Sequence, residues 1–237
     1  MHGRATLLAL VRYPTFAVPT LLLPTIFFIL FGLPQAHASH RSVTASFAAY
    51  AVLTVVFFQF GVGIAAERAD PWESFLRTLP VGAAARFAGR IITAFAFATL
   101  SAGLVLATAA AASFSSFGLA AWGRFLLALV AGAVPVSLLG IALGYWVPAK
   151  GALPVANVVY LVFSYAGGLW TEPRRLPSAA EAVGRYLPTR QWGEVLWAAV
   201  LARPWQAENW LVLLAFACLF AGLAAWGFRR DEGRRFR

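Results

Sequence analysis

The chain has 237 residues, of which 61% are hydrophobic and 12% are charged, and its net charge is +10. An ordinary soluble domain has about 45–50% apolar and about 25% charged residues, so this composition excludes one and predicts an all-α polytopic membrane protein. Every basic residue except Lys150 is an arginine, and the arginines flank apolar runs. We therefore expect the positive charge to orient the chain in a lipid bilayer rather than to bind nucleic acid.

Six apolar runs are the predicted membrane spans. Each has 17 to 23 residues, which matches the about 20 residues that an α-helix needs to cross the bilayer. Before them, residues 1–15 carry Arg4 and Arg12 and no small-residue cleavage site, so we expect an interfacial helix that stays on the chain. The predicted spans are 16–33, 47–66, 91–112, 125–147, 153–169 and 210–228.

Prolines and small residues give some of these runs a specific character. Pro19 and Pro24 lie inside the first run, and they predict a bent or irregular helix. Small residues that recur every four positions let a neighbouring helix approach closely. Such seams are predicted in the third and fourth spans at Ala94, Ala98, Ala102, Gly140 and Gly144.

Residues 67–90 lie between the second and third spans and form the longest charged stretch inside the apolar sequence. Asp70 is placed as an N-cap, Pro71 as the first helical residue, and Glu73 as the second member of a capping box. These signals predict a short helix over 71–79, which Pro80 ends. A helix of this length is too short to span a bilayer and must lie against lipid headgroups or another protein.

The short helix has two distinct faces. Its apolar side chains Trp72, Phe75 and Leu76 fall on one stripe, while Glu73 and Arg77 lie four positions apart on the other face. The apolar stripe suits either a lipid surface or a protein groove. Because the helix is so firmly specified by its cap and charged flanks, the sequence favours docking on a protein.

A second long segment, residues 171–209, separates the last two spans. Ser178 with Glu181 predicts a capping box for one short helix, and Thr189 predicts the start of another. We expect these two amphipathic helices to lie at a membrane face, where the tryptophans of the segment are favoured. The chain then closes with a basic tail at 229–237.

The basic residues predict the orientation. With a cytoplasmic N-terminus, the inner segments carry twelve basic residues, the outer short loops carry two (Arg41 and Arg124), and segment 171–209 carries five with four glutamates. The short-loop bias places both termini and residues 67–90 in the cytoplasm and segment 171–209 outside. The expected location is the plasma (inner) membrane, as a multi-pass protein.

No span interior holds Asp, Glu, Lys, Arg or His, which argues against a proton- or ion-coupled carrier. No nucleophile, base and orienting acid can be assembled, no metal-ligand cluster is present, and no GxxxxGK[ST] loop exists, so we expect neither an enzyme nor a nucleotide-hydrolysing chain. Buried amides in membrane helices act as interhelical hydrogen-bonding groups or line a pathway. The candidates for a substrate pathway are Gln59, Asn157, Tyr160 and Tyr165.

One family combines these features. Glu67 and Arg68 close the second span, and the pattern W-E-x-x-L-R-x-x-P follows at Trp72 to Pro80. Together with the six spans and the long segment before the last one, this arrangement resembles the ABC-2-type export permease family. One departure is that Asp70-Pro71 stands where the family often has Gly-Thr.

The resemblance implies a permease subunit of an ATP-driven ABC exporter, with no cofactor of its own. A second permease copy, as a homodimer, and two separate ATPase subunits that bind ATP and Mg²⁺ are the implied partners. The implied ATPase-coupling residues are Glu67, Arg68, Pro71, Trp72, Glu73, Phe75, Leu76, Arg77 and Pro80. The alternative function is an ATP-independent membrane scaffold or assembly factor, in which the same helix would dock a partner without a transport cycle.

Overall fold

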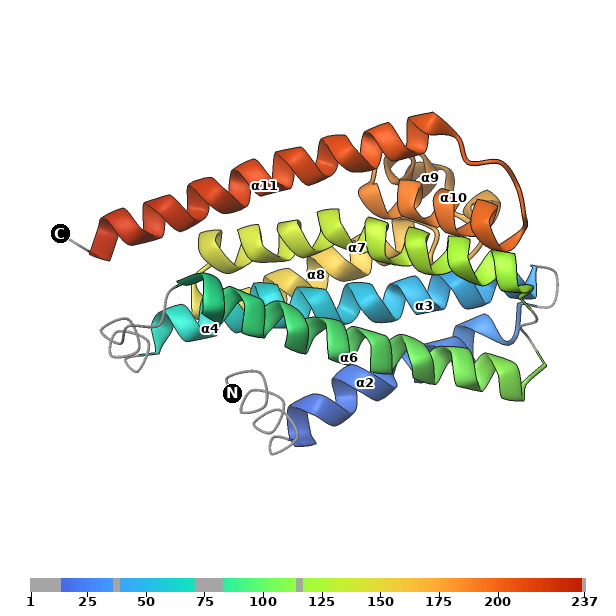
Figure 1. Cartoon of the computed structure of the whole chain (residues 1–237), viewed down its shortest axis with the longest axis horizontal. Coiled ribbons are helices and arrows are strands. Elements are labelled where there is room, and N and C mark those ends of the chain that lie inside the picture. Colours follow the sequence, from blue (N-terminus) through green and yellow to red (C-terminus); the bar gives the residue numbers. More distant parts are fainter. Residues whose placement is uncertain (1–13, 36–38, 71–82, 114–116, 236–237) are drawn as a thin grey trace.

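The computed structural model describes residues 14–35, 39–70, 83–113 and 117–235. In these ranges every regular element is a helix (Figure 1). Most of the predicted interfacial helix (1–15) and the whole predicted short helix over 71–79 lie outside the described residues.

Two of the long helices change from α- to π-helical geometry along their length without a break in the chain. The bounds are α2 Pro14–Phe27, η1 Phe28–Gly32, α3 His40–Val56, η2 Phe57–Val62, α4 Gly63–Ala69, α6 Ala83–Ala111, α7 Leu119–Trp146, α8 Ala149–Ala166, η3 Pro173–Arg175, α9 Ser178–Gly184, α10 Pro188–Val200 and α11 Ala207–Arg235.

Among the described residues, five helices are long and apolar enough to cross a membrane, and they overlap the predicted spans two to six in order. They are His40–Ala69, Ala88–Ala111, Leu119–Trp146, Ala149–Ala166 and Ala207–Glu232. The first predicted span corresponds to the shorter apolar helix Val18–Gly32, which falls below the about 20 residues that a straight crossing needs. The chain is thus a helical polytopic membrane protein.

The continuous helix α3–η2–α4 is the centre of the bundle (Figure 1). Of its most apolar window, 78% is buried inside the chain, against 22% to 39% for the other four long helices. Helices α2, α6, α7, α8 and α10 all pack against it, whereas α11 packs on α7 and α10. A helix that is apolar all round has no polar face to present to water, and here protein covers most of that surface.

The small-residue seams are confirmed as close-packing positions. Ala94, Ala98 and Ala102 are each at most 5% exposed, on the helix α6 that packs chiefly against α3. A Cβ added at Gly140 would lie 3.3 Å from the Cβ of Phe60, and one at Gly144 would lie 2.7 Å from the Cβ of Ile64. Both seams are therefore filled by helices of the same chain.

The first span is irregular, as its prolines predict. Pro19 and Pro24 lie inside α2, and the helix passes into the π-helical segment η1 before it ends. The second π-helical segment, η2 with the sequence FFQFGV, contains no proline and was not predicted. Short π-helical segments are uncommon and occur frequently at functional sites.

The segment before the last span does contain two short helices, but their starts differ from the prediction. Helix α9 begins at Ser178 with Pro177 as its N-cap and has no side-chain capping hydrogen bond, so the capping box is wrong. Helix α10 begins at Pro188, and the Thr189 hydroxyl instead donates a hydrogen bond to the Phe163 carbonyl at 2.7 Å.

Helix α10 packs into the bundle rather than only against its end. The Trp192 indole N–H donates to the Ala128 carbonyl in the middle of α7 at 3.0 Å, and its ring occupies the space where a Cβ of Gly132 would be. The Trp197 indole N–H donates to the hydroxyl of Ser46 on α3 at 2.7 Å. These bonds and that of Thr189 fix α10 to three different helices.

Candidate functional site

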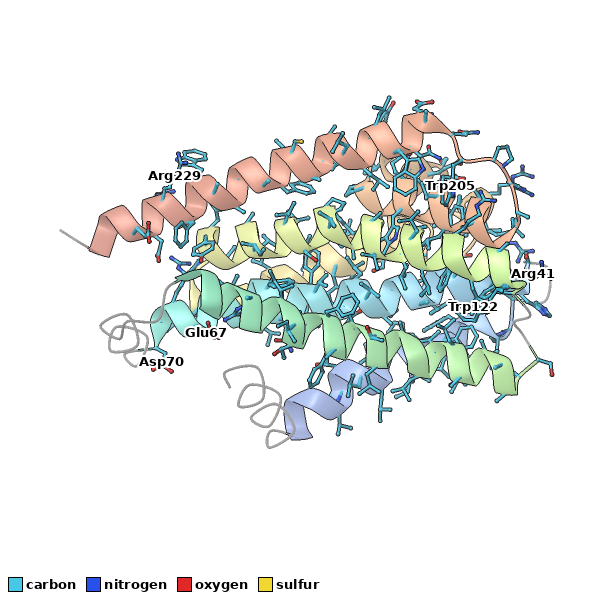
Figure 2. All side chains as sticks on the ribbon, viewed as in Figure 1. Arg41, Glu67, Asp70, Trp122, Trp205 and Arg229 are labelled. Atoms are coloured by element: carbon cyan, nitrogen blue, oxygen red, sulfur yellow. The ribbon has the colours of Figure 1, made fainter. Side chains whose placement is uncertain are left out.

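The labelled side chains in Figure 2 define the two ends of the bundle. Glu67, Asp70 and Arg229 lie at one end, called here the Glu67 end, and Arg41, Trp122 and Trp205 lie at the other, called here the Trp205 end. Helix α4 ends and α6 begins at the Glu67 end (Figure 1), so the flanks of the predicted coupling helix are at that end.

Arg90 connects the start of α6 to the helix before the coupling region. Its guanidinium forms an ion pair with the carboxylate of Glu67 and donates a hydrogen bond to the Gln59 carbonyl at 2.8 Å. Gly63 makes this approach possible, because a Cβ there would lie 2.8 Å from Arg90 Nη1. A charged side chain that is only 14% exposed needs such partners to offset the loss of hydration.

Arg68 makes the equivalent connection to α7 and α11. Its guanidinium donates to Asp231 Oδ1 from Nε at 2.9 Å and from Nη2 at 2.7 Å, and from Nη1 to the Gly144 carbonyl at 2.8 Å. Its Cζ also lies 5.6 Å from the centre of the Tyr145 ring. Neighbouring residues of α4 thus hold different helices: Glu67 holds α6, and Arg68 holds α7 and α11.

The ends of α7 and α11 are also joined directly. Trp146 packs edge-on against Trp226, with ring centres 4.6 Å apart, and its indole N–H donates to the Leu223 carbonyl at 3.0 Å. Arg230 places its Cζ 5.0 Å from the Trp146 ring centre. The residues of the predicted basic tail up to Arg235 continue α11 as a helix, so part of that tail belongs to the packed bundle.

Of the nine predicted coupling residues, the structure describes two. Glu67 and Arg68 make the intrachain contacts given above, so their charges are engaged within the bundle. The remaining seven lie outside the described residues: Pro71, Trp72, Glu73, Phe75, Leu76, Arg77 and Pro80.

The candidate pathway residue Gln59 lies inside η2. Its side chain is 9% exposed, and its amide nitrogen is buried with no hydrogen-bond partner among the described residues. Buried donors are nearly always paired in folded proteins, because an unmade hydrogen bond costs about 1–3 kcal/mol. The unpaired amide in a π-helical segment therefore marks a position where a ligand, a water or another chain would supply an acceptor.

The other three pathway candidates lie on α8. Tyr160 is buried, and its ring centre lies 5.7 Å from that of Phe58 in η2, so α8 and η2 face each other. Asn157 is half-buried and lies one turn from Tyr160, whereas Tyr165 is 40% exposed. The structure thus brings Tyr160 to the helix that holds Gln59 and leaves Tyr165 at the surface.

Two aromatic residues that were not among the candidates form the centre of this region. The Tyr50 ring lies 6.2 Å from Tyr160 and 5.5 Å from Trp170, and Trp170 also packs against Phe27 at 5.1 Å. The Tyr50 hydroxyl is buried without a partner among the described residues. The available signal was a tyrosine inside an apolar run, since Tyr50 is the fourth residue of the second predicted span; the sequence prediction did not use it.

Among the described residues there is no group of three or more histidine, cysteine or carboxylate side chains that could hold a metal ion. The single cysteine, Cys218, is exposed on α11. The described polar groups can therefore form hydrogen bonds and ion pairs, and they offer no metal-ligand cluster.

Comparison with known proteins adds one relative. No family model matches the chain. Over 227 aligned residues the sequence is 23% identical to the protein named "Putative transport permease YvfS" of Bacillus subtilis (strain 168). The alignment covers 93% of this chain and 93% of that protein. The chain is thus similar along nearly its whole length to a protein that is named as a transport permease.

Proposed function

We propose that the chain is the permease subunit of an ATP-driven ABC exporter. In this proposal it forms the substrate pathway and is coupled to a separate ATPase through residues 67–90. The full-length similarity to the B. subtilis protein named as a transport permease supports a permease. The resemblance of residues 67–80 to ABC-2-type permeases supports the ATPase partner and export.

The observation that carries the proposal is the anchoring of both ends of residues 67–90. At the start of this stretch, Glu67 and Arg68 reach α6, α7 and α11, and at its end Arg90 reaches back to Glu67 and to the Gln59 carbonyl. A force applied to residues 71–82 would act on all these helices through ion pairs and hydrogen bonds of defined geometry. A helix that only rested on lipid would not need such connections.

The same contacts suggest how the pathway responds. Arg90 binds the carbonyl of Gln59, whose own side-chain amide is buried and unpaired. Displacement of Arg90 by the ATPase would release this carbonyl and change the π-helical segment η2, which faces Tyr160 through Phe58. Movement at the Glu67 end is thereby connected to the polar side chains of Gln59 in η2 and Tyr160 in α8.

A homodimer is part of the proposal, and the surface through which two copies would pair can be narrowed by burial. The small-residue seams at Ala94 to Ala102 and at Gly140 and Gly144 are filled by the same chain, so they do not mediate pairing. Helix α8 is the better candidate. Only 28% of its apolar window is buried inside the chain, and its exposed side chains include the apolar Leu153, Val158 and Val162. In the proposed dimer a second copy covers this surface in place of lipid.

The proposal is tested by expressing the chain together with any P-loop ATPase that is found to be encoded beside its gene. The expected result is a detergent-stable complex of two permease and two ATPase chains, with ATP hydrolysis that exceeds that of the isolated ATPase. Recovery of the chain without any ATPase, and unchanged hydrolysis when it is added, would contradict the proposal. That outcome would favour an ATP-independent scaffold or assembly factor.

A further inference from the structure

A pocket of about 500 Å³ opens at the Trp205 end, away from the coupling region. It lies between the start of α3, the loop that follows α8, and the end of α10 with its following turn. Its volume falls within the range of about 300–1,000 Å³ that is typical of small-molecule sites. Residues from all three segments line it, among them Ser42, Ser46, Phe47, Trp170, Arg174, Arg190, Glu194, Trp197 and Arg203.

Three aromatic residues line the pocket among mostly polar ones. Phe47 is fully buried beneath it, and Trp170 and Trp197 line its sides. The Trp197 ring is fixed by its hydrogen bond to Ser46, and Trp170 is fixed by packing against Tyr50. Rigid indole walls bind flat or apolar groups at a low cost in conformational entropy.

The charged groups of the pocket are unevenly paired. Arg190 forms an ion pair with Glu194 at 2.9 Å and lies over Trp197, with its Cζ 5.6 Å from the ring centre. Arg174 and Arg203 also line the pocket, and neither forms an ion pair among the described residues. Apart from Glu194, which pairs with Arg190, Glu172 is the only carboxylate among the lining residues. The lining therefore carries three arginines against two glutamates and favours an anion.

Each of the two loops that carry these arginines contains a residue in the left-handed region. Ala202, directly before Arg203, has a φ of 55°, and Gly168, in the other loop, has a φ of 79°. An alanine in the left-handed region is strained, and such strain is concentrated at functional sites.

We propose that this pocket binds a small amphipathic anion. Its apolar or ring portion would lie between Trp170 and Trp197 over Phe47, and its acidic group would be bound by Arg174 and Arg203. An anionic lipid headgroup and a soluble aromatic acid share this chemistry. The site is independent of the ATPase, because it lies at the opposite end from residues 67–90 and needs no nucleotide to form.

The test uses the full chain in phosphatidylcholine nanodiscs and naphthalene-2-sulfonate as the probe. Equilibrium dialysis should show saturable binding beyond that of empty nanodiscs. The double variant Arg174→Gln/Arg203→Gln should bind at least about tenfold more weakly, because two charge-assisted contacts are lost. The matched control, Arg175→Gln/Arg185→Gln, removes two exposed arginines that do not line the pocket and should bind like the wild type.

Two further arms complete the design. The cation 2-naphthylmethylammonium should bind at least about tenfold more weakly than the sulfonate, because it lacks the acidic group. Nanodiscs that contain phosphatidylglycerol compete with the probe if the natural ligand is a lipid headgroup and do not compete if it is a soluble acid, and either result supports the site. The proposal is overturned by the absence of saturable binding, by equal binding of the cation, or by undiminished binding to the Arg174/Arg203 variant.

Discussion

Arg68 and Asp231 lie 163 positions apart in the sequence and are joined by two hydrogen bonds of 2.7 and 2.9 Å to one carboxylate oxygen. The Asp231 side chain is 9% exposed and that of Arg68 is 23% exposed. This contact connects the helix that enters the coupling region to the last helix of the chain. It also explains why a single carboxylate in the arginine-rich end of α11 is buried: it is the counter-ion of Arg68.

The first prediction concerns this pair. Arg68→Met should destabilise the bundle by about 1–3 kcal/mol, because Asp231 and the Gly144 carbonyl lose their donor while they stay largely buried. The measurement is thermal unfolding of the purified protein in detergent. Arg229→Met removes an exposed arginine of α11, two residues before Asp231. It serves as the matched control and should change the unfolding midpoint little.

The double variant Arg68→Met/Asp231→Leu distinguishes a pair from two separate effects. Replacement of both partners removes the buried carboxylate together with its guanidinium, so the double variant should be more stable than Arg68→Met alone. Strictly additive losses in the two single variants would contradict a direct energetic coupling between these residues.

Gly132 provides a second prediction, about the packing of α10. Gly132→Ala should cost about 1–3 kcal/mol, because the new methyl group would overlap the Trp192 ring and displace its hydrogen bond to Ala128. Gly123→Ala, on the same helix with nothing near the added methyl group, should be neutral or stabilising by up to about 1 kcal/mol. Unfolding in detergent measures both, and equal stabilities would show that α10 does not pack there.

A third prediction follows from the turn after α10. Ala202 has a φ of 55°, and the Arg203 N–H that follows it donates to the Ala198 carbonyl at 2.8 Å. This is the helix-ending geometry in which glycine is preferred. Ala202→Gly should therefore raise stability by up to about 1 kcal/mol, measured as an increase in the midpoint of thermal unfolding. A decrease would mean that the left-handed turn is not strained in the protein.

The orientation in the membrane is the fourth prediction. In a Cys218→Ala background, a cysteine at Ser178 should react with an impermeant thiol reagent added to intact cells, and a cysteine at Ser74 should react only after lysis. Ser178 is exposed at the start of α9, so its accessibility is not limited by packing. Labelling of position 74 from outside would reverse the proposed orientation.

The sequence predicts the spans well because each long apolar run has one compatible structure. Their ends are less predictable: α3 begins at His40 rather than 47, and α6 begins at Ala83 rather than 91. Polar residues next to an apolar run continue a helix when they find partners within the chain, as Arg90 does at Glu67. Hydropathy alone therefore underestimates the lengths of these helices.

The contacts between distant segments could not be predicted from the sequence. The apolar stripe of α10 at Trp192, Val195 and Leu196 is compatible with a lipid surface and with a protein interior. In the structure these side chains are buried, and the Trp192 ring packs against Gly132 of α7. The π-helical segment η2 contains no proline that would predict an irregular helix. The pairing of Arg68 with Asp231 depends on how two separate helix ends meet, which local patterns do not encode.

The role of residues 67–90 in coupling is tested most directly by removing the apolar stripe of the short helix. Each large side chain buried in a partner contributes about 1.5–3 kcal/mol before the costs of binding. Trp72→Ala/Phe75→Ala/Leu76→Ala should therefore weaken ATPase association by at least about a hundredfold. The matched control removes three exposed apolar side chains of α11, Leu211→Ala/Leu214→Ala/Leu219→Ala, and should leave association intact.

The decisive measurement is ATP hydrolysis by the partner ATPase in vesicles that contain equal amounts of wild-type or variant permease. The account predicts that the wild type and the α11 control stimulate hydrolysis equally, while the Trp72/Phe75/Leu76 variant gives the rate of the ATPase alone. Full stimulation by that variant, at wild-type abundance in the vesicles, would contradict a coupling role for residues 67–90.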